Sequence, residues 1–335
     1  MRRVVTVGDL RVTVAEWRRD GLRVGFVPTM GALHRGHLLL VEEAHRHADR
    51  VVVSIFVNPT QFGEGEDLDA YPRDLEADEA ALGGLGDRAP DLVFAPTVAD
   101  VYAPDAVTTV QVADLTDVLC GASRPGHFDG VATVVNKLFN MVQPDVAVFG
   151  RKDFQQLAII RRMVRDLNVP VEIIGGPTVR ESDGVAMSSR NRYLTGQDRI
   201  AARALSQALR AAVEQARTVR AAERPIDPGS ILDAATGTLA ETSGVRIDYI
   251  EALDAETLGP PDTRGQGPTG VDVEAPQERL LLVAVAAHVG TARLIDNVVI
   301  GDLADEERLL EATDSAQPVG TPRRTTRRRP PCGAS

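Results

Sequence analysis

The chain has 335 residues, a formal net charge of −11 at pH 7 and 43% hydrophobic residues. This length accommodates two domains with a substantial core, and the acidic charge argues against a nucleic-acid-binding surface over the whole protein, because binders of phosphate backbones carry a basic field. The apolar runs fall well short of the roughly 20 residues that cross a bilayer, and the N-terminus lacks the apolar core of a signal peptide. The two cysteines offer no disulfide framework. We therefore expect a cytoplasmic protein that binds neither membrane nor nucleic acid.

Short apolar runs alternate with stretches of helical character through the first half of the chain. The runs lie at residues 23–27, 51–57, 92–95, 146–149 and 171–174. Such alternation predicts a parallel sheet with helices on its faces. The run 51–57 is almost continuously apolar, which indicates a central strand covered on both sides. The predicted fold class is therefore α/β, with a Rossmann-like parallel sheet over residues 1–178.

The composition changes after Pro177. Two amphipathic helical patterns, two strand patterns and a Pro/Gly-rich loop follow at residues 197–222, 231–242, 245–253, 280–287 and 259–277. We expect a smaller α+β domain over residues 179–302. Residues 303–335 are first acidic and then rich in Arg and Pro, so we expect them to be disordered. Their arginines leave contact with an acidic partner open, but a solvated tail without a role is favoured.

Polar or glycine-rich segments follow three of the predicted strands, at residues 28–31, 58–62 and 150–153. In an open α/β sheet, ligands bind at the carboxyl ends of the strands, near a topological switch point. Polar loops are common, but three such segments at one edge predict a shared crevice.

Two histidines stand where the first of these segments opens into a helical pattern, in the order His34-Arg35-Gly36-His37. The first turn of a helix has unpaired N–H groups and a partial positive charge, so it favours anions. Positions three apart share one face, so both rings can reach one phosphate and stabilise charge on its oxygens. The alternatives are a zinc pair and a helix start that merely carries histidines, but zinc needs a third ligand that the cysteines do not offer. We predict an anion site and no metal held by the protein.

Amide and charged side chains follow the other two strands. Lys152 supplies a point charge for phosphate, while Asp153 is equally suited to cap a helix. Gln156 lies one turn further on, and Asn58 and Gln61 follow the second strand. Amides suit a hydroxylated, carboxylated substrate because they both donate and accept hydrogen bonds. Each of these residues alone is more often structural than functional.

Two further segments are candidates for the same pocket. Residues 187–192, Met-Ser-Ser-Arg-Asn-Arg, form a cationic, hydroxyl-bearing stretch that either closes on phosphates or makes a helix-capping turn. Residues 124–128 precede a predicted helix over 131–142, and from this region His127 and Lys137 are weaker candidates.

Five motifs occur in a fixed order along the first two thirds of the chain. They are Pro-Thr-Met-Gly-Ala-Leu-His-x-Gly-His at 28–37, Phe-Val-Asn-Pro-Thr-Gln-Phe at 56–62, Arg-Pro-x-His-Phe at 124–128, Phe-Gly-x-Lys-Asp-Phe-Gln-Gln at 149–156 and Met-Ser-Ser-Arg-Asn at 187–191. Together they closely resemble the pantothenate synthetase family, the pantoate:beta-alanine ligases. The His-x-Gly-His element alone is shared with the wider nucleotidyltransferase superfamily, including class I aminoacyl-tRNA synthetases.

The resemblance implies a two-step ligation. ATP and pantoate give a pantoyl adenylate and pyrophosphate, and beta-alanine then attacks the activated carbonyl to release AMP and pantothenate. No covalent enzyme nucleophile is expected, and Mg²⁺ would accompany the ATP, held mainly by phosphates and water. The family also implies a nucleotidyltransferase fold that binds ATP and pantoate over residues 1–178, a lid over 179–302, and a homodimer.

Carried over residue by residue, the resemblance makes His37 the assigned proton donor. The other catalytic residues would be His34, Lys152, Ser188 and Arg190, with pyrophosphate bound by the last three. The substrate-binding residues would be Gln61, Gln156, Asn58 and His127, of which Gln61 would meet both pantoate and beta-alanine. The nucleotide site would comprise Met30, Gly31, Ala32, Leu33, His34, Arg35, Gly36, His37, Gly150, Arg151, Lys152, Asp153, Val179, Met187, Ser188, Ser189 and Arg190.

The chain departs from the family pattern in few places. Arg151 stands where Glu or Gln is frequent, and the loop 259–277 and the tail after residue 302 exceed the usual length. One alternative is a nucleotidyltransferase that moves AMP or CMP onto a phosphorylated acceptor, which gives no reason for the two glutamines. Another is a silent nucleotide sensor, which would be free to lose His37, Lys152 or Ser188.

Overall fold

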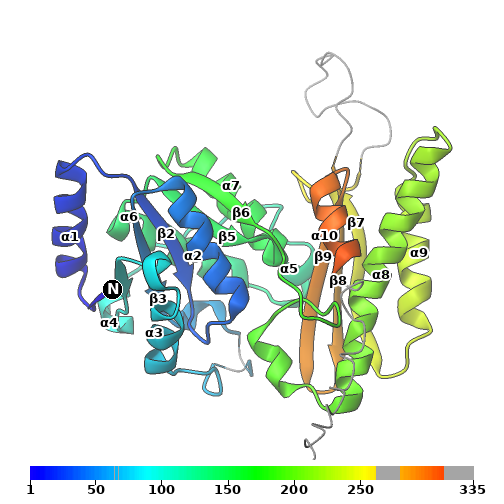
Figure 1. The fold of residues 1–335 in the computed structure, drawn as a ribbon, viewed down its shortest axis with the longest axis horizontal. Helices are drawn as coiled ribbons and strands as arrows, with labels where there is room; N and C mark the ends of the chain where they lie inside the picture. The colour runs from blue at the N-terminus through cyan, green and yellow to red at the C-terminus, as the bar shows by residue number, and fades with distance from the viewer. Residues whose placement is uncertain (64, 67, 262–279, 313–335) are drawn as a thin grey trace, which may run out of the picture.

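The computed structural model describes residues 1–63, 65–66, 68–261 and 280–312. A six-stranded parallel sheet with helices on both faces lies beside a three-stranded antiparallel sheet (Figure 1). The large sheet has the order β1-β4-β3-β2-β5-β6, and the small one β7-β8-β9. The predicted α/β class with a smaller α+β unit is confirmed.

The strands of the large sheet are β1 Arg2–Val4, β2 Val24–Thr29, β3 Arg50–Ile55, β4 Leu92–Phe94, β5 Val146–Gly150 and β6 Glu172–Gly176. The helices connecting them are α1 Val7–Arg19, α2 Arg35–His47, α3 Leu75–Gly83, α4 Val98–Val101, α5 Leu119–Ser123, α6 His127–Val142 and α7 Phe154–Asp166, with short 3-10 turns η1 Pro59–Gln61, η2 Gly86–Arg88 and η3 Arg151–Asp153. The second unit contains η4 Ser189–Tyr193, α8 Gly196–Ala221, α9 Pro228–Ala240, β7 Val245–Asp254, β8 Leu281–Val289, β9 Ala292–Ile300 and α10 Leu303–Glu311.

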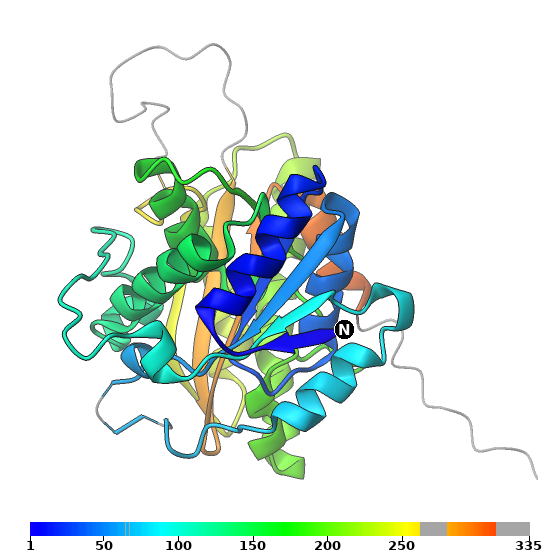
Figure 2. The same ribbon diagram turned by 90° about the vertical axis from the view of Figure 1, so that its left-hand side faces the viewer.

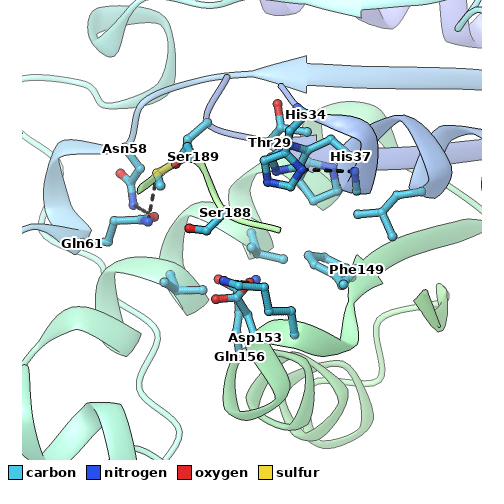
Figure 3. Close-up of a pocket in the computed structure, with 18 of the residues that line it drawn as sticks. Thr29, His34, His37, Asn58, Gln61, Phe149, Asp153, Gln156, Ser188 and Ser189 are labelled. Carbon is cyan, nitrogen blue, oxygen red and sulfur yellow. Dashed lines mark hydrogen bonds and ion pairs between the residues drawn. The ribbon is translucent and has the colours of Figure 1, made fainter. Parts of the chain in front are cut away.

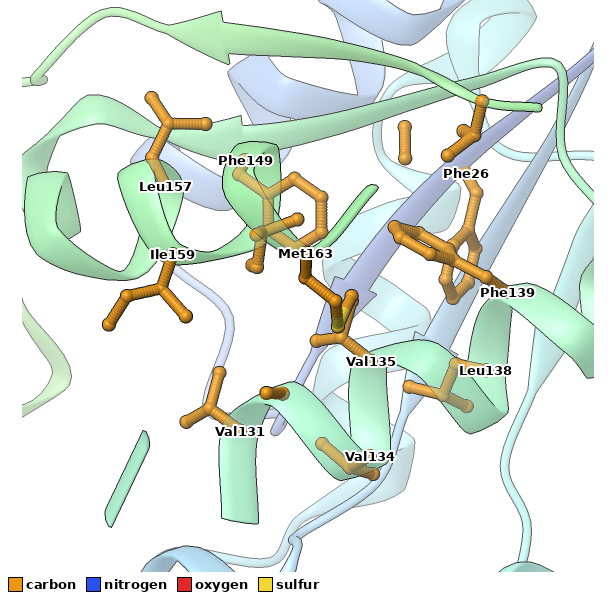
Figure 4. Packing of buried hydrophobic residues seen from close by; sticks show 14 of the residues in the cluster. Phe26, Val131, Val134, Val135, Leu138, Phe139, Phe149, Leu157, Ile159 and Met163 are labelled. Carbon is orange, nitrogen blue, oxygen red and sulfur yellow. The ribbon is translucent and has the colours of Figure 1, made fainter. Parts of the chain in front are cut away.

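Alternate residues of the central strands enter two different cores. Phe26, Val52 and Phe149 pack with α1, α6 and α7, whereas Val53 and Val148 pack with α2 and α3. Figure 4 shows the first of these cores, and in Figure 2 α1 crosses in front of the strands. A strand buried on both faces must be apolar at consecutive positions, which explains the continuous run in β3.

The strand β8 joins the two units through a similar alternation. Val283 and Val285 pack with α8 and α9, whereas Leu282 and Ala284 belong to the cluster that also holds the α6 and α7 side chains. The predicted boundary at residue 178 stays a prediction, because the two sheets share this buried cluster.

The chain contains ordered elements that the sequence patterns missed. The short edge strand β1 and the strand β9 were not predicted, and α10 occupies the start of the expected disordered tail. Disorder from residue 303 is therefore wrong for residues 303–311. Helix α10 is held because Leu309 is buried and because Asp302 caps it by accepting from the N–H of Asp305. Residues 313–335 and most of the 259–277 loop lie outside the described residues.

No helix in the described part of the chain is both long enough and apolar enough to cross a membrane.

Candidate active site

A cavity of about 260 Å³ opens at the carboxyl ends of β2 and β5. These two strands are neighbours although the chain visits β3 and β4 between them, so the cavity lies at the switch point of the sheet. The sequence-predicted residues that line it are Met30, His34, Gly36, His37, Asn58, Gln61, His127, Gly150, Lys152, Asp153, Gln156, Val179, Met187, Ser188, Ser189 and Arg190. Segments far apart in the sequence thus meet in one pocket, as Figure 3 shows.

The turn before α2 is held in place by hydrogen bonds to Asp78. The N–H groups of Ala32 and Leu33 donate to the two carboxylate oxygens of Asp78 at 3.0 and 2.7 Å. Gly31 has φ +81°, and a Cβ there would lie 2.7 Å from the Asp78 carboxylate, so only glycine fits. Burial raises the pKa of Asp78. Gly31, Ala32 and Leu33 do not line the cavity themselves.

Two predicted nucleotide-site arginines have their side chains paired elsewhere. Arg35 forms an ion pair with Glu42 at 3.3 Å, and Arg151 forms one with Asp302 at 2.8 Å. Neither lines the cavity. The departure from the family pattern at Arg151 therefore serves a contact with the N-terminus of α10.

The two histidines close a capping box at the start of α2. His34 Nδ1 accepts from the N–H of Gly36 at 3.1 Å, and His37 Nδ1 accepts from the N–H of His34 at 3.3 Å. The ring centroids lie 4.1 Å apart. A Cβ on Gly36 would meet the His34 ring at 2.8 Å. The His-x-Gly-His spacing therefore allows one ring to fold over the backbone and the other to stack beside it.

This arrangement fixes both the charge and the tautomer of the rings. Burial lowers the pKa of His34 to about 4, with the Lys152 charge adding to the effect. Burial also lowers the pKa of His37 to about 3, aided by His34 and Lys152. Both rings are thus neutral at pH 7, and because each Nδ1 accepts a hydrogen bond, each ring proton belongs to Nε2. The pair offers two neutral N–H donors to the pocket.

The amide of Gln61 is held in one orientation. Asn58 Nδ2 donates to Gln61 Oε1 at 3.1 Å, and Gln61 Nε2 points to Met30 Sδ at 3.0 Å (Figure 3). Asn58 is buried, and its Oδ1 accepts from the Tyr102 hydroxyl at 2.8 Å. Asn58 therefore orients Gln61, and beside the contact with Met30 one N–H of its amide is available to donate to a ligand in the pocket.

His127 supports the same loop. Its Nδ1 donates to the carbonyl oxygen of Gln61 at 2.7 Å, since its Nε2 accepts from Arg124 at 3.1 Å. Burial lowers the pKa of His127 to about 4, with the Arg124 charge contributing. Arg124 is itself paired with Glu66 at 2.6 Å. His127 lines the cavity, but both ring nitrogens are used within the protein, so its predicted contact with substrate stays a prediction.

The opposite wall carries the remaining polar groups. Lys152 Nζ lies 4.0 Å from Asp153 Oδ2 just after β5, and Gln156 follows in the first turn of α7. The Gln156 amide has no side-chain hydrogen bond to the described part of the chain. Ser188 caps η4 by accepting from the N–H of Arg190 at 3.3 Å. In Figure 3 Ser188 faces Asp153 and Gln156 across the cavity.

Comparison with known proteins identifies the family. The family model for pantoate-beta-alanine ligase matches residues 2–299. The chain belongs to the pantoate-beta-alanine ligase family. A pantothenate synthetase of Pseudomonas entomophila is 52% identical over 303 residues, covering 90% of this chain and 98% of the relative.

Solved structures of the family have the same fold. A pantothenate synthetase from Thermus thermophilus superposes with a TM-score of 0.75 at 46% identity, covering 89% of this chain and 99% of that one. A pantoate-beta-alanine ligase from Francisella tularensis, complexed with beta-gamma ATP and beta-alanine, gives a TM-score of 0.65 at 29% identity, covering 89% of this chain and 97% of that one.

Several residues that shape this ligase site were missed in the sequence. Asp78 sits among other acidic residues of α3, so nothing in its surroundings distinguished it. Tyr102 follows a short helix in an irregular stretch. The pair Asp296 and Asn297 did carry a signal, since two polar residues interrupt an apolar strand and both are buried.

The described residues contain no group of three or more His, Cys, Asp or Glu side chains placed to hold a metal ion. Asp153 is the one carboxylate among the described residues that line the cavity, and its side chain is half exposed.

Proposed function

We propose that the protein condenses pantoate with beta-alanine to pantothenate at the expense of ATP, through a pantoyl adenylate, with release of AMP and pyrophosphate. The observation that carries the proposal is the pairing of two kinds of polar group in one cavity. The cavity presents neutral imidazole donors and a lysine, which suit phosphates, and it also presents the amides of Gln61 and Gln156, which suit a hydroxy acid.

In this proposal His34 and His37 stabilise the nucleotide phosphates by donating hydrogen bonds from Nε2. A neutral ring with a pKa of about 3 is a weak base, so it carries no mobile proton at pH 7 and acts as a hydrogen-bond donor. Lys152 supplies the positive charge that the neutral rings lack, and pyrophosphate would leave toward Lys152, Ser188 and Arg190.

Pantoate would lie between Gln61 and Gln156. The NH₂ group of Gln61 has a fixed orientation and suits a carboxylate or hydroxyl oxygen, and the unused amide of Gln156 can adapt to the other side. This brings the pantoate carboxylate to the α-phosphate, where holding two reactants in register supplies much of the rate.

The site favours direct attack without a covalent enzyme intermediate. Across the described residues, no Ser or Thr hydroxyl of the cavity has a histidine partner, and the Ser188 oxygen is used as a cap. Mg²⁺ fits the site as an ion that arrives with ATP, because phosphates and water supply the oxygen ligands it prefers and the cavity offers one carboxylate among its described lining residues. The ion would offset phosphate charge. We further propose a cytoplasmic homodimer.

The test is pantoate-dependent exchange of labelled pyrophosphate into ATP without beta-alanine, followed by addition of beta-alanine. Exchange, then AMP and pantothenate, would support both half-reactions. Pyrophosphate exchange that does not depend on pantoate would contradict the proposal. So would the absence of exchange by folded protein in the presence of magnesium. Either result would favour a transferase with another acceptor.

A further inference from the structure

Asn297 on β9 reaches out of the small sheet to the nucleotide side of the cavity. Its Nδ2 donates to the carbonyl oxygen of Lys152 at 2.7 Å and to that of Arg151 at 3.2 Å. The residue is 6% exposed. It does not line the main cavity but borders an adjoining one of about 100 Å³, which shares Lys152, Ser188 and Arg190 with the main cavity. Asn297 therefore contacts the backbone that carries Lys152.

Its neighbour Asp296 holds the second phosphate-facing segment. Asp296 accepts from both terminal nitrogens of Arg180, at 2.6 and 3.0 Å, and these side chains are 2% and 6% exposed. Arg180 also donates to the carbonyl oxygen of Gly184 at 3.1 Å, and Arg180 pairs with Ala186 in an antiparallel bridge. The stretch that leads into Met187 is thereby fixed to β9.

The strand explains why two adjacent residues serve two segments. Successive side chains of a strand point to opposite faces. Val299 packs in the core of the large sheet on the Asn297 side, whereas Val298 packs with α8 on the other. Asp296 also accepts from the N–H of Asn297 at 2.8 Å, which links the two contacts directly.

This polar pair is a poor choice for stability alone. Buried polar groups cost free energy unless they are hydrogen-bonded, and a buried ion pair is often no more stabilising than apolar residues of the same shape. What Asp296 and Asn297 do provide is a fixed position for the segments that they contact. Two segments from different parts of the chain, each carrying a cationic group toward the cavity, are tied to one rigid strand.

We propose that Asn297 is a positioning residue for the nucleotide, and that it sets the place of the Lys152 ammonium by holding the two carbonyl groups of the turn before α7. Asp296 does the same for residues 187–190 through Arg180. The inference rests on the proposed function only in naming ATP as the ligand that the turn meets. It predicts a larger loss of ATP interaction than of pantoate interaction, because Gln61 belongs to η1 and Gln156 is held by the body of α7, whereas Lys152 lies in the turn that Asn297 contacts.

The test compares Asn297→Leu, which keeps the shape and removes the donors, with Val298→Ala on the opposite face of the same strand. Val298 is 1% exposed and packs on the α8 side, so its truncation lowers stability without disturbing the Lys152 turn. For Asn297→Leu we expect kcat/KM for ATP in the pyrophosphate exchange to fall about a hundredfold, with KM for pantoate within about twofold of the unsubstituted protein. Val298→Ala should change neither.

ATP binding measured by calorimetry separates this inference from the proposed function. If the unsubstituted protein binds ATP but shows no pantoate-dependent exchange, the function fails while the calorimetric comparison still tests Asn297. Asn297→Ala replaces Asn297→Leu if the latter does not fold. A folded Asn297 variant with unchanged ATP affinity and ATP dependence would overturn the inference. The inference would also be overturned if Asn297→Leu lowered kcat/KM for ATP and for pantoate equally, and by the same factors as Val298→Ala. That result would indicate a structural role alone.

Discussion

The carboxyl edge of the large sheet and the docking of α10 both bury polar side chains, but they use them differently. Glu306 of α10 is fully buried, and its oxygens accept from Arg220 at 2.9 and 3.0 Å and from the N–H of Gly301 at 2.9 Å. Asp305 accepts from the N–H of Val299 at 3.0 Å. These carboxylates make all of these contacts within the protein, where they hold α10 to α8 and to β9.

At the edge of the large sheet, by contrast, internal hydrogen bonds use one side of each polar group and leave the other side for a ligand. His34, His37 and Gln61 each have an atom that is anchored within the chain and a donor that faces the cavity. Buried polarity therefore does not by itself mark a site. A site is marked by groups that are oriented by the protein but incompletely hydrogen-bonded.

The largest expected effect is on chemistry at the cavity. His37→Ala should slow pantoate-dependent pyrophosphate exchange about 100- to 1000-fold, because it removes a preorganised donor to a phosphate. The free energy of unfolding should fall by only about 1 kcal/mol, the value of a lost cap. His47→Ala, at the exposed end of the same helix, is the matched control. Unchanged exchange in the His37 variant would remove this ring from the mechanism.

The reverse pattern is expected at α10. Glu306→Ala should lower the free energy of unfolding by about 3 kcal/mol in urea titrations, because Arg220 loses its buried partner. Exchange activity of the folded fraction should remain that of the unsubstituted protein. Glu307→Ala, the exposed neighbour, should leave both quantities unchanged. A comparable loss of kcat would mean that the two regions are coupled.

A smaller and more selective effect is expected at Gln61. Gln61→Ala should raise KM for pantoate about 30-fold, the equivalent of about 2 kcal/mol for an oriented hydrogen bond to a charged group. KM for ATP should stay within about twofold. The exposed Gln111→Ala serves as control. Equal increases in both KM values would contradict separate binding groups for the two substrates.

The last and most gradual effect is on the pH dependence of stability. The folded pKa values of about 4 for His34 and about 3 for His37 lie below the ordinary value of 6.5, so the unfolded chain binds more protons between these values. The stabilising effect is complete above pH 6.5 and is lost as the pH falls toward 4. Lowering the pH from about 7 to about 5 should cost about 2 kcal/mol per ring in urea titrations.

The matched variant for this measurement is His37→Asn, which should show a shallower dependence. An equal slope in both proteins would place the titrating groups elsewhere. The pH profile of kcat/KM, which reports ionisations of the ligand-free protein, should show none from these rings near neutrality.

The local sequence pattern predicts much of this structure. The strands β2 to β5 follow from apolar runs, because a strand covered on both faces must be apolar throughout, and the edge strand β6 follows from the shorter run at 171–174. The location of the pocket follows from the polar loops after three of them, because parallel strands end at one edge. The helix start at His34 follows from the apolar periodicity of the residues after it, whereas the structure shows that His34 itself caps the helix.

Other features depend on contacts between distant segments. No property of residues 30–40 indicates that Asp78 holds their turn, and α10 is ordered only because Glu306 and Leu309 find buried partners on elements far away in the sequence. The sequence also placed Asn58 and His127 among the substrate ligands, and that stays a prediction. The structure adds that Asn58 holds the Gln61 amide and that His127 donates to the Gln61 carbonyl oxygen. Whether a polar side chain faces a ligand or a neighbour depends on its environment.

The sequence by itself determined the family, the α/β class, the edge of the sheet that carries the site and the residue types that line it, because these depend on local periodicity and on motifs of short spacing. Only the tertiary structure decided which nitrogen of each histidine faces the cavity, which amides remain unused, and that β9 ties both phosphate-facing segments together through Asp296 and Asn297. These properties arise from burial and from hydrogen bonds, and the bonds of β9 join residues that lie far apart in the sequence. Such partners leave no periodic trace in the chain.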